Sequence, residues 1–188
     1  MNEMKDFKNA TRLQQILSEK SPHHSVPLSL YFDGKGRRFR LCRLGQRDLE
    51  KLVRMYAHFD HEQTALGLPP RGENQIREWL ARLFASDVQL IAKHGREVAA
   101  HAAWIKSSDT QAEVIVFVHQ AYQGVGLGKK LLLAVVTMAR FMGLDILWAE
   151  VENRNARMIH INHELGFQTV DLHQGSRQMA LDMHEAGQ

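Results

Sequence analysis

The feature that most constrains this chain is a glycine-rich segment at residues 123–130, which reads QGVGLGKK. It follows a run of β-branched and aromatic residues at 114–118 and precedes apolar residues at helical spacing between 131 and 141. We therefore expect a strand, a tight turn and a helix in succession. Glycines let backbone N–H groups approach an anion closely, and the helix N-terminus adds the positive end of its dipole. The segment predicts a phosphate-binding loop, with a purely structural glycine-rich turn as the alternative.

Two common nucleotide-binding motifs do not fit this segment. The P-loop requires its second glycine where this chain has Lys129. The dinucleotide fingerprint G-x-G-x-x-G fails because Lys129 or Leu131 occupies the third glycine position. The pattern that does match is [QR]-x-x-G-x-[GA], through Gln123, Gly126 and Gly128.

Composition predicts an ordinary globular protein. The 188 residues, 44% hydrophobic and 24% charged, suit one domain with its own core. The only cysteine, Cys42, has no internal disulfide partner, which fits a reducing compartment. No run approaches the roughly 20 apolar residues that span a bilayer, and residues 1–20 lack the apolar region of a secretory signal. We therefore expect a cytoplasmic protein with no membrane partner.

Charge and histidine patterns point away from nucleic acid and metal as partners. The net charge is +3, and the positive residues are scattered rather than clustered, which fits an anionic ligand better than nucleic acid. His160 and His163 lie three residues apart on an expected helix, but no further ligand completes a metal-binding motif around them. We therefore expect no metal.

The spacing of apolar residues predicts strands and helices along most of the chain. Residues 1–36 form an extension with a short helix at 4–18, a linker at 21–27 and a strand at 28–32. In the main domain, residues 37–188, we expect strands at 38–44, 88–92, 98–105, 114–118, 146–151, 167–172 and 178–183, and helices at 48–59, 76–83, 131–141 and 156–165. Asp48 is placed to cap the first of these helices. This order, β-αα-βββ-α-β-α-ββ, predicts an α/β fold with a mixed sheet.

Two motifs in this order resemble those of a known family. Residues 116–128, VFVHQAYQGVGLG, resemble the acetyl-CoA signature of the GNAT superfamily of N-acetyltransferases. A second stretch, from Asn155 to Met158 and on to Leu165-Gly166-Phe167, is similar to the family's N-x-x-x…LGF helix. The resemblance covers about four-fifths of the chain. It implies a mixed, mostly antiparallel central sheet flanked by helices, and transfer of an acetyl group from acetyl-CoA to an amine.

The resemblance also implies which residues bind acetyl-CoA. The strand end pairs with the pantetheine arm, the loop amides hold the pyrophosphate, and an asparagine lies near the cofactor arm. The implied residues are Val116, Phe117, Val118, Gln123, Gly124, Val125, Gly126, Leu127, Gly128, Lys129 and Asn155. Asn155 equally fits a simple helix N-cap.

For the catalytic base the resemblance favours Glu113. An aliphatic amine with a pKa near 10 is mostly protonated at pH 7, so a base must remove its proton before it attacks the thioester directly. Similar bacterial protein-lysine acetyltransferase domains carry a glutamate at the start of this strand, in an A-E-V context like residues 112–114. His101, on the neighbouring strand, is the reserve base, and a solvated glutamate at a strand end is the structural alternative. The amide of Phe117 or Val118 is the implied oxyanion donor.

One position departs from the family pattern. Many relatives have a tyrosine acid in the last helix, where this chain has Asn162. Asparagine cannot serve as a proton donor there, although its amide can hydrogen-bond the sulfur or the substrate. The acceptor stays open among a protein lysine, an N-terminal amine, a polyamine and a small amine. A non-catalytic acyl-CoA sensor or interaction module is the alternative function, and the edge strands of this fold leave a homodimer open.

Overall fold

A computed structural model describes residues 29–60, 68–84 and 88–184 of the chain. The helix predicted at 4–18 and the linker predicted at 21–27 lie outside the described residues. The strands are β1 (Ser29–Phe32), β2 (Arg38–Arg43), β3 (Val88–His94), β4 (Glu97–Lys106), β5 (Gln111–Val118), β6 (Ile146–Glu152), β7 (Gln168–Leu172) and β8 (Ser176–Asp182). The helices are α2 (Leu49–Ala57), α3 (Glu73–Leu83), α4 (Leu127–Phe141) and α5 (Ala156–Glu164). The predicted element order is confirmed, with β1 and β2 preceding the helical pair.

All eight strands form one sheet in the order β1-β2-β3-β4-β5-β6-β8-β7. Every neighbouring pair is antiparallel except β5 and β6. These two strands are joined through α4, and such a crossover is what a parallel connection requires. The predicted mixed, mostly antiparallel sheet is therefore confirmed.

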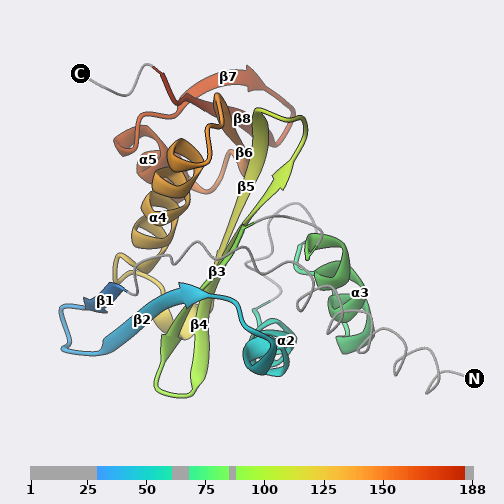
Figure 1. Ribbon diagram of the computed structural model, residues 1–188, viewed down its shortest axis with the longest axis vertical. Coiled ribbons are helices and arrows are strands. Elements are labelled where there is room, and N and C mark those ends of the chain that lie inside the picture. The colour runs from blue at the N-terminus through green and yellow to red at the C-terminus, as the bar shows by residue number, and fades with distance from the viewer. Residues whose placement is uncertain (1–28, 61–67, 85–87, 185–188) are drawn as a thin grey trace, which may run out of the picture.

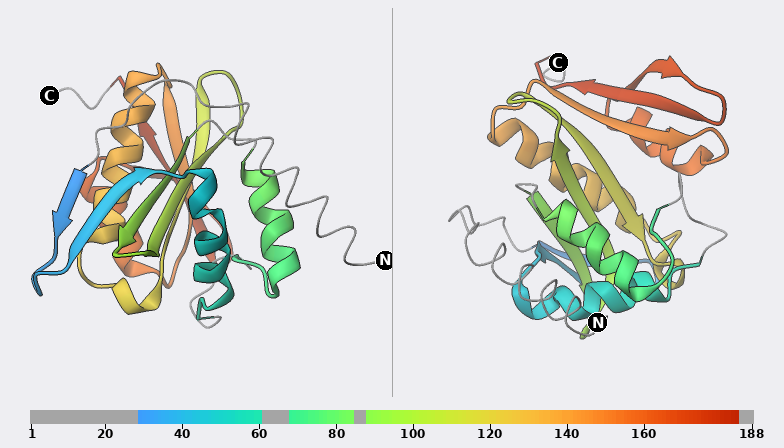
Figure 2. Two further views of the ribbon diagram at one scale, coloured as in Figure 1. Left: turned by 60° about the horizontal axis from the view of Figure 1, so that its bottom comes forward. Right: turned by 90° about the vertical axis from the view of Figure 1, so that its right-hand side faces the viewer.

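Helices cover both faces of the sheet. Figures 1 and 2 show α4 and α5 on one face and α2 and α3 on the other. Leu131 and Val135 of α4 belong to the larger buried cluster, whereas Tyr56 and Leu80 belong to a second cluster on the opposite face. Residues 98–104 of β4, between the two layers, are buried without interruption, as expected for a strand covered on both sides.

The sheet opens between β5 and β6. Their pairing is confined to three residue pairs, from Gln111 opposite Ile146 to Glu113 opposite Trp148. Beyond Glu113 the two strands are no longer paired with each other, although β5 stays paired with β4 as far as Val118. The backbone of β5 therefore presents hydrogen-bonding groups toward the gap, and this gap positions the site.

The first hairpin is closed by its turn residues. The Asp33 carboxylate accepts hydrogen bonds from the backbone N–H groups of Lys35 and Arg37, both at 2.9 Å, and from Arg37 Nε at 2.7 Å. Such carboxylate-to-backbone bonds favour tight turns. Because β1 pairs with β2 along its length, the domain boundary predicted near residue 37 falls inside a paired hairpin.

The start of α2 differs from the prediction. Asp48 precedes the helix, as expected, but its side chain makes no capping bond to the helix backbone. Its carboxylate instead binds Lys93 Nζ at 2.7 Å and Lys51 Nζ at 3.3 Å. Electrostatic pairing with β3 therefore replaces the predicted cap. Among the described helices, none is both long and apolar enough to cross a bilayer.

Candidate active site

The glycine loop ends at the N-terminus of α4 and exposes backbone donors there. Gly124 and Gly126 have φ angles of 74° and 81°, in the region that favours glycine, and Gly126 is the N-cap residue of α4. The first hydrogen bond within the helix runs from the N–H of Lys130 to the carbonyl of Gly126. Helix geometry leaves the N–H groups of the preceding residues without partners inside the helix. This is the arrangement that binds an anion.

An outer cavity of about 720 Å³ opens beside this loop. It is bounded by the loop, the end of β5 and the start of α5. The start of α5 is far from the other two in the sequence. The residues predicted to bind the cofactor all line it except Val125, whose carbonyl faces Tyr31 instead. A Cβ added at Gly128 would lie 3.5 Å from a methyl group of Val118. This is an ordinary van der Waals distance, so the position has space for a small side chain such as alanine. A cavity of this size suits a large phosphate-bearing ligand.

Three cationic side chains border the outer cavity, and two of them were not predicted. Lys129, Arg154 and Arg157 line it, and Lys129 Nζ also lies 3.0 Å from a carboxylate oxygen of Glu164. The two arginines come from the region where β6 passes into α5. No local pattern marks them as ligand-binding, because their role depends on α5 lying beside the glycine loop.

The end of β5 is held in place by side chains on both faces. Gln123 Nε2 donates to the carbonyl of Val118 at 3.0 Å. The Phe117 ring packs edge-on against Tyr56 and Trp79, with ring centroids 5.7 and 5.8 Å apart respectively. Because the N–H of His119 donates to the carbonyl of Ala99, alternate residues of β5 point their backbone groups toward β4, and Phe117 is one of them. The backbone groups of Val116 and Val118 face the gap instead, and a role of Phe117 toward the cofactor stays a prediction.

An inner cavity of about 90 Å³ lies deeper in the gap between β5 and β6. It shares Val116, Phe117 and Asn155 with the outer cavity, and Glu113 and Glu150 line it as well. Burial raises the pKa of the Glu113 carboxyl, and the nearby Glu150 carboxylate raises it further. Glu150 was not predicted. Residues two apart on a strand face the same side of the sheet, so Glu150 shares its side with Trp148 and Glu152.

Asn162 projects from α5 toward the inner cavity. Its side chain is buried, with 1% exposure, and lines the cavity. Neither its amide nitrogen nor its amide oxygen has a hydrogen-bond partner among the described residues. Buried polar groups are nearly always paired, so these two atoms mark a place where a ligand group would complete the site.

Asn155 forms the helix cap that was its alternative interpretation. Its side-chain oxygen accepts a hydrogen bond from the N–H of Met158 at 3.1 Å at the start of α5. The same residue lines both cavities. The cap fixes the position of α5 beside the gap, and a role toward the cofactor stays a prediction.

His101 is enclosed in the core. Its side chain has 0% exposure and its two ring nitrogens bind Tyr56 Oη at 2.7 Å and Gln89 Oε1 at 2.6 Å. Gln89 Nε2 donates to the carbonyl of Leu83, so the Gln89 side-chain oxygen is the atom that accepts from His101 Nε2. His101 Nδ1 then carries no proton and accepts the hydrogen bond from the Tyr56 hydroxyl. Burial lowers the pKa of His101 to about 3. This neutral ring holds two strands and α2 together and does not line either cavity.

The histidine pair on α5 is engaged elsewhere. His163 Nδ1 donates to the carbonyl of Phe167 at 3.1 Å, and His160 Nε2 lies 3.7 Å from Glu164. In residues 29–60, 68–84 and 88–184, no three side chains of the metal-binding types come together.

The geometry defines a class: an α/β protein whose split sheet leads from an anion-binding helix terminus to a partly buried carboxylate. Comparison with known proteins identifies that class. The chain belongs to the acetyltransferase (GNAT) family, whose sequence profile matches residues 51–167. The predicted family is therefore confirmed.

Two characterised relatives resemble part of the chain. L-methionine sulfoximine/L-methionine sulfone acetyltransferase of Salmonella typhimurium is 46% identical over 52 residues, which is 28% of this chain and 30% of that protein. L-amino acid N-acyltransferase MnaT of Escherichia coli is 32% identical over 101 residues, 50% of this chain and 58% of that one. The matched stretch is thus under two thirds of either relative.

Solved structures agree over a larger part of the chain. The GNAT domain of S. lividans PAT superposes with a TM-score of 0.73 at 23% identity, covering 86% of this chain and 99% of that domain. YncA, a putative acetyltransferase from Salmonella typhimurium solved with acetyl-CoA, gives a TM-score of 0.63 at 25% identity, covering 80% and 96%. These structures confirm the predicted fold class.

Proposed function

We propose that this protein transfers an acetyl group from acetyl-CoA to a primary amine. The observation that carries the proposal is that the outer cavity at the N-terminus of α4 and the inner cavity lined by Glu113 adjoin, since they share lining residues. Membership of the acetyltransferase (GNAT) family supports it, as do relatives whose names describe acyl transfer to amino acids.

The residues around the outer cavity fit the phosphate end of coenzyme A. The N–H groups from Gly126 to Lys129 would hold the pyrophosphate, and Arg154 and Arg157 would add positive charge. The open backbone edge of β5 would pair with the amide-containing pantetheine arm. When bound, acetyl-CoA supplies an acetyl group activated as a thioester.

Glu113 is the proposed proton acceptor. A base at neutral pH works best when its own pKa approaches the working pH, and burial together with Glu150 raises the pKa of Glu113 in that direction. His101 is a poor alternative, because it is buried, neutral and already bonded through both nitrogens. The carboxylate would take the proton from the incoming ammonium group and leave the amine free to attack.

Asn162 is proposed as the hydrogen-bonding group at the reacting end of the site. Its unpaired amide nitrogen is a donor and its unpaired oxygen an acceptor. Donation to the thioester or the departing sulfur would orient the acyl group without transferring a proton. Asn162 would thus replace the tyrosine acid of many relatives by a binding role.

Calorimetric titration with acetyl-CoA tests the cofactor site. Gly128→Glu places a carboxylate in the first turn of α4, where an acid is favourable to the helix but repels phosphate. We expect tight binding by the wild type, a loss of at least roughly 100-fold in the variant, about 2.7 kcal/mol, and little change in Gly128→Ala. A folded wild type that does not bind acetyl-CoA would contradict the proposal.

A thiol-release assay with candidate acceptors separates an enzyme from an acyl-CoA sensor. L-methionine sulfoximine, free L-amino acids, a polyamine, a lysine peptide and a peptide with a free N-terminus cover the amines considered. Release that depends on one of these amines supports an acetyltransferase. Tight cofactor binding with no release for any of them favours the sensor. The cytoplasmic location and the homodimer stay predictions.

A further inference from the structure

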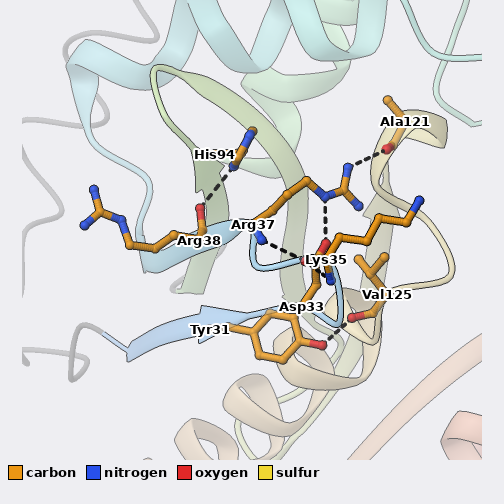
Figure 3. A network of polar contacts seen from close by, with 8 residues as sticks. All are labelled: Tyr31, Asp33, Lys35, Arg37, Arg38, His94, Ala121 and Val125. Atoms are coloured by element: carbon orange, nitrogen blue, oxygen red, sulfur yellow. Dashed lines mark hydrogen bonds and ion pairs between the residues drawn. The ribbon is translucent and has the colours of Figure 1, made fainter.

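The first hairpin reaches the rear of the glycine loop. Figure 3 shows Tyr31 of β1 beside Val125, and the Tyr31 hydroxyl donates a hydrogen bond to the Val125 carbonyl. The two residues are 94 positions apart in the chain. This contact lies on the side of the loop away from the outer cavity, since Val125 is the loop residue that does not line that cavity.

The contact fixes the direction of a peptide group. The Val125–Gly126 peptide is trans and planar. In a trans peptide the C=O and N–H bonds point in opposite directions. With the Val125 carbonyl held toward Tyr31, the N–H of Gly126 points the other way, toward the cavity that Gly126 lines.

Steric contact adds to the hydrogen bond. A Cβ placed on Gly126 would lie 2.9 Å from the Tyr31 hydroxyl oxygen, which means that the hydroxyl fills the space behind this glycine. Lys130 Nζ lies 5.7 Å from the centroid of the Tyr31 ring, and the ring packs near Phe39 with centroids 6.1 Å apart. The ring is therefore held between α4 and β2, and the hydroxyl has a defined position.

Arg37 makes a second, independent link from the same hairpin. Its Nη1 donates to the carbonyl of Ala121 at 3.3 Å, as Figure 3 shows, and its guanidinium lies 5.6 Å from the Tyr122 ring centroid. The Asp33 carboxylate holds the other side of the guanidinium at 2.7 Å. The hairpin thus contacts the segment before the loop as well as the loop itself.

We propose that Tyr31 is a positioning residue for phosphate recognition: it turns the Val125–Gly126 peptide so that the Gly126 N–H faces the pyrophosphate. The proposal rests on the proposed function for the identity of the ligand. It does not rest on it for the orientation of the loop. The hairpin Ser29–Arg43 is in this view part of the cofactor site rather than an accessory to the domain.

Tyr31→Phe tests the proposal, because it removes the hydroxyl and keeps the ring between α4 and β2. We expect calorimetry to show acetyl-CoA affinity reduced roughly five- to tenfold, the effect of one hydrogen bond. The KM for acetyl-CoA should rise by the same factor, with kcat and the acceptor KM unchanged. The matched control is Phe32→Tyr, next to it on β1, whose side chain is exposed at 59%; its values should equal those of the wild type.

Acetyl-pantetheine, which lacks the pyrophosphate, separates positioning from a general loss of structure. Tyr31→Phe should leave the KM for this short donor unchanged. An equal loss for both donors, or unchanged acetyl-CoA affinity in a folded variant, would overturn the proposal.

Residual dipolar couplings of the backbone N–H bonds keep the test independent of the ligand, because they report the direction of each bond. Without any cofactor, Tyr31→Phe should change the couplings at residues 124–128 and leave those of the later turns of α4 unchanged. Changed loop couplings in a protein that fails to bind acetyl-CoA would uphold the loop orientation and reject the proposed function. Unchanged couplings in the loop would reject the role of Tyr31 whatever the ligand is.

Discussion

The outer and inner cavities use different kinds of group to do their work. The outer cavity combines the backbone of a glycine loop with cationic side chains. The inner cavity has glutamates on β5 and β6 and an unpaired asparagine on α5. One end is suited to a phosphate, and the other to an ammonium group that must lose a proton. Glu152 lines both cavities, whereas the three cationic side chains line the outer one and none of the described cationic side chains lines the inner one.

This difference teaches how each end is encoded. Binding of a phosphate by backbone N–H groups needs glycines at fixed spacing within one segment, so it can be detected as a motif in the sequence. Side-chain recognition in the inner cavity draws single residues from three elements, and only the fold brings them together. The predictions below test whether the two ends are separable, in order of decreasing effect.

The largest effect is expected for Glu113→Gln. At pH 7 we expect kcat to fall by about 10²- to 10⁴-fold, with acetyl-CoA affinity measured by calorimetry unchanged. Because the folded-state pKa of Glu113 is raised, its contribution to stability is lost as pH rises from the unfolded value through the folded one. The variant should therefore unfold at higher urea concentration than the wild type above that range.

Glu97→Gln, an exposed change at the start of β4, is the control and should alter neither quantity. Full activity of Glu113→Gln at neutral pH would show that another group takes the proton. Reduced acetyl-CoA affinity would show that the two ends are not separable.

The second effect concerns His101, a titratable group one strand away from Glu113 but sealed from both cavities. Its folded pKa is about 3, below the unfolded value near 6.5, so the unfolded state binds the proton first as pH falls. Stability should therefore decline below pH 6.5, by up to about 1.4 kcal/mol per pH unit. Urea unfolding at pH 7 and pH 5 measures this.

His101→Gln should be less stable at pH 7 but depend less on pH. His160→Gln changes an exposed histidine and should keep the wild-type dependence. An identical pH dependence in His101→Gln and the wild type would mean that His101 is not the group responsible.

The third effect is expected for Asn162→Leu, which keeps the branched shape and removes the amide. We expect kcat/KM to fall roughly tenfold, consistent with one or two lost hydrogen bonds. The melting temperature should stay or rise, because two unpaired polar atoms leave the interior. A variant that is less stable yet fully active would indicate a structural role for Asn162.

The smallest effect is a shift in pH profile for Glu150→Gln. Removing this negative charge lowers the pKa of Glu113, because the Glu150 carboxylate helps to raise it. The acidic limb of the kcat/KM profile should move to lower pH by less than about one unit. The Gln oxygen can still accept from Ser176, as Glu150 does. A limb that stays in place would show that Glu150 does not act on the base.

The sequence predicted the fold well, and it named residues that the structure brings together around the outer cavity. The apolar spacing placed every described α-helix and strand, although α4 begins at Leu127, inside the glycine loop, rather than at residue 131. Local spacing carries this information, because helices and strands bury one face with their own period. The residues predicted to bind the cofactor, except Val125, line one cavity, and most of them belong to one continuous segment.

The inner end and the hairpin contact could be predicted only in part. Glu113 was named, but the partner that raises its pKa, Glu150, lies on a strand that becomes its neighbour only through the parallel crossover. His101 is buried because α2 covers β4, and no local sequence pattern predicts that packing. Tyr31 was placed in an extension, whereas β1 pairs with β2 and the Tyr31 hydroxyl reaches the glycine loop 94 positions further along the chain.

The short pairing between β5 and β6 has a consequence for how long the protein survives. Each half of the sheet is continuous, but three residue pairs join them, against seven between β4 and β5 and seven between β6 and β8. On the proposed function, bound acetyl-CoA fills this seam and pairs with its open edge. Any ligand that binds only the folded state adds to its stability by mass action. The resistance of this protein to proteolysis should then rise and fall with the supply of acetyl-CoA, so that its turnover reports the metabolic state around it.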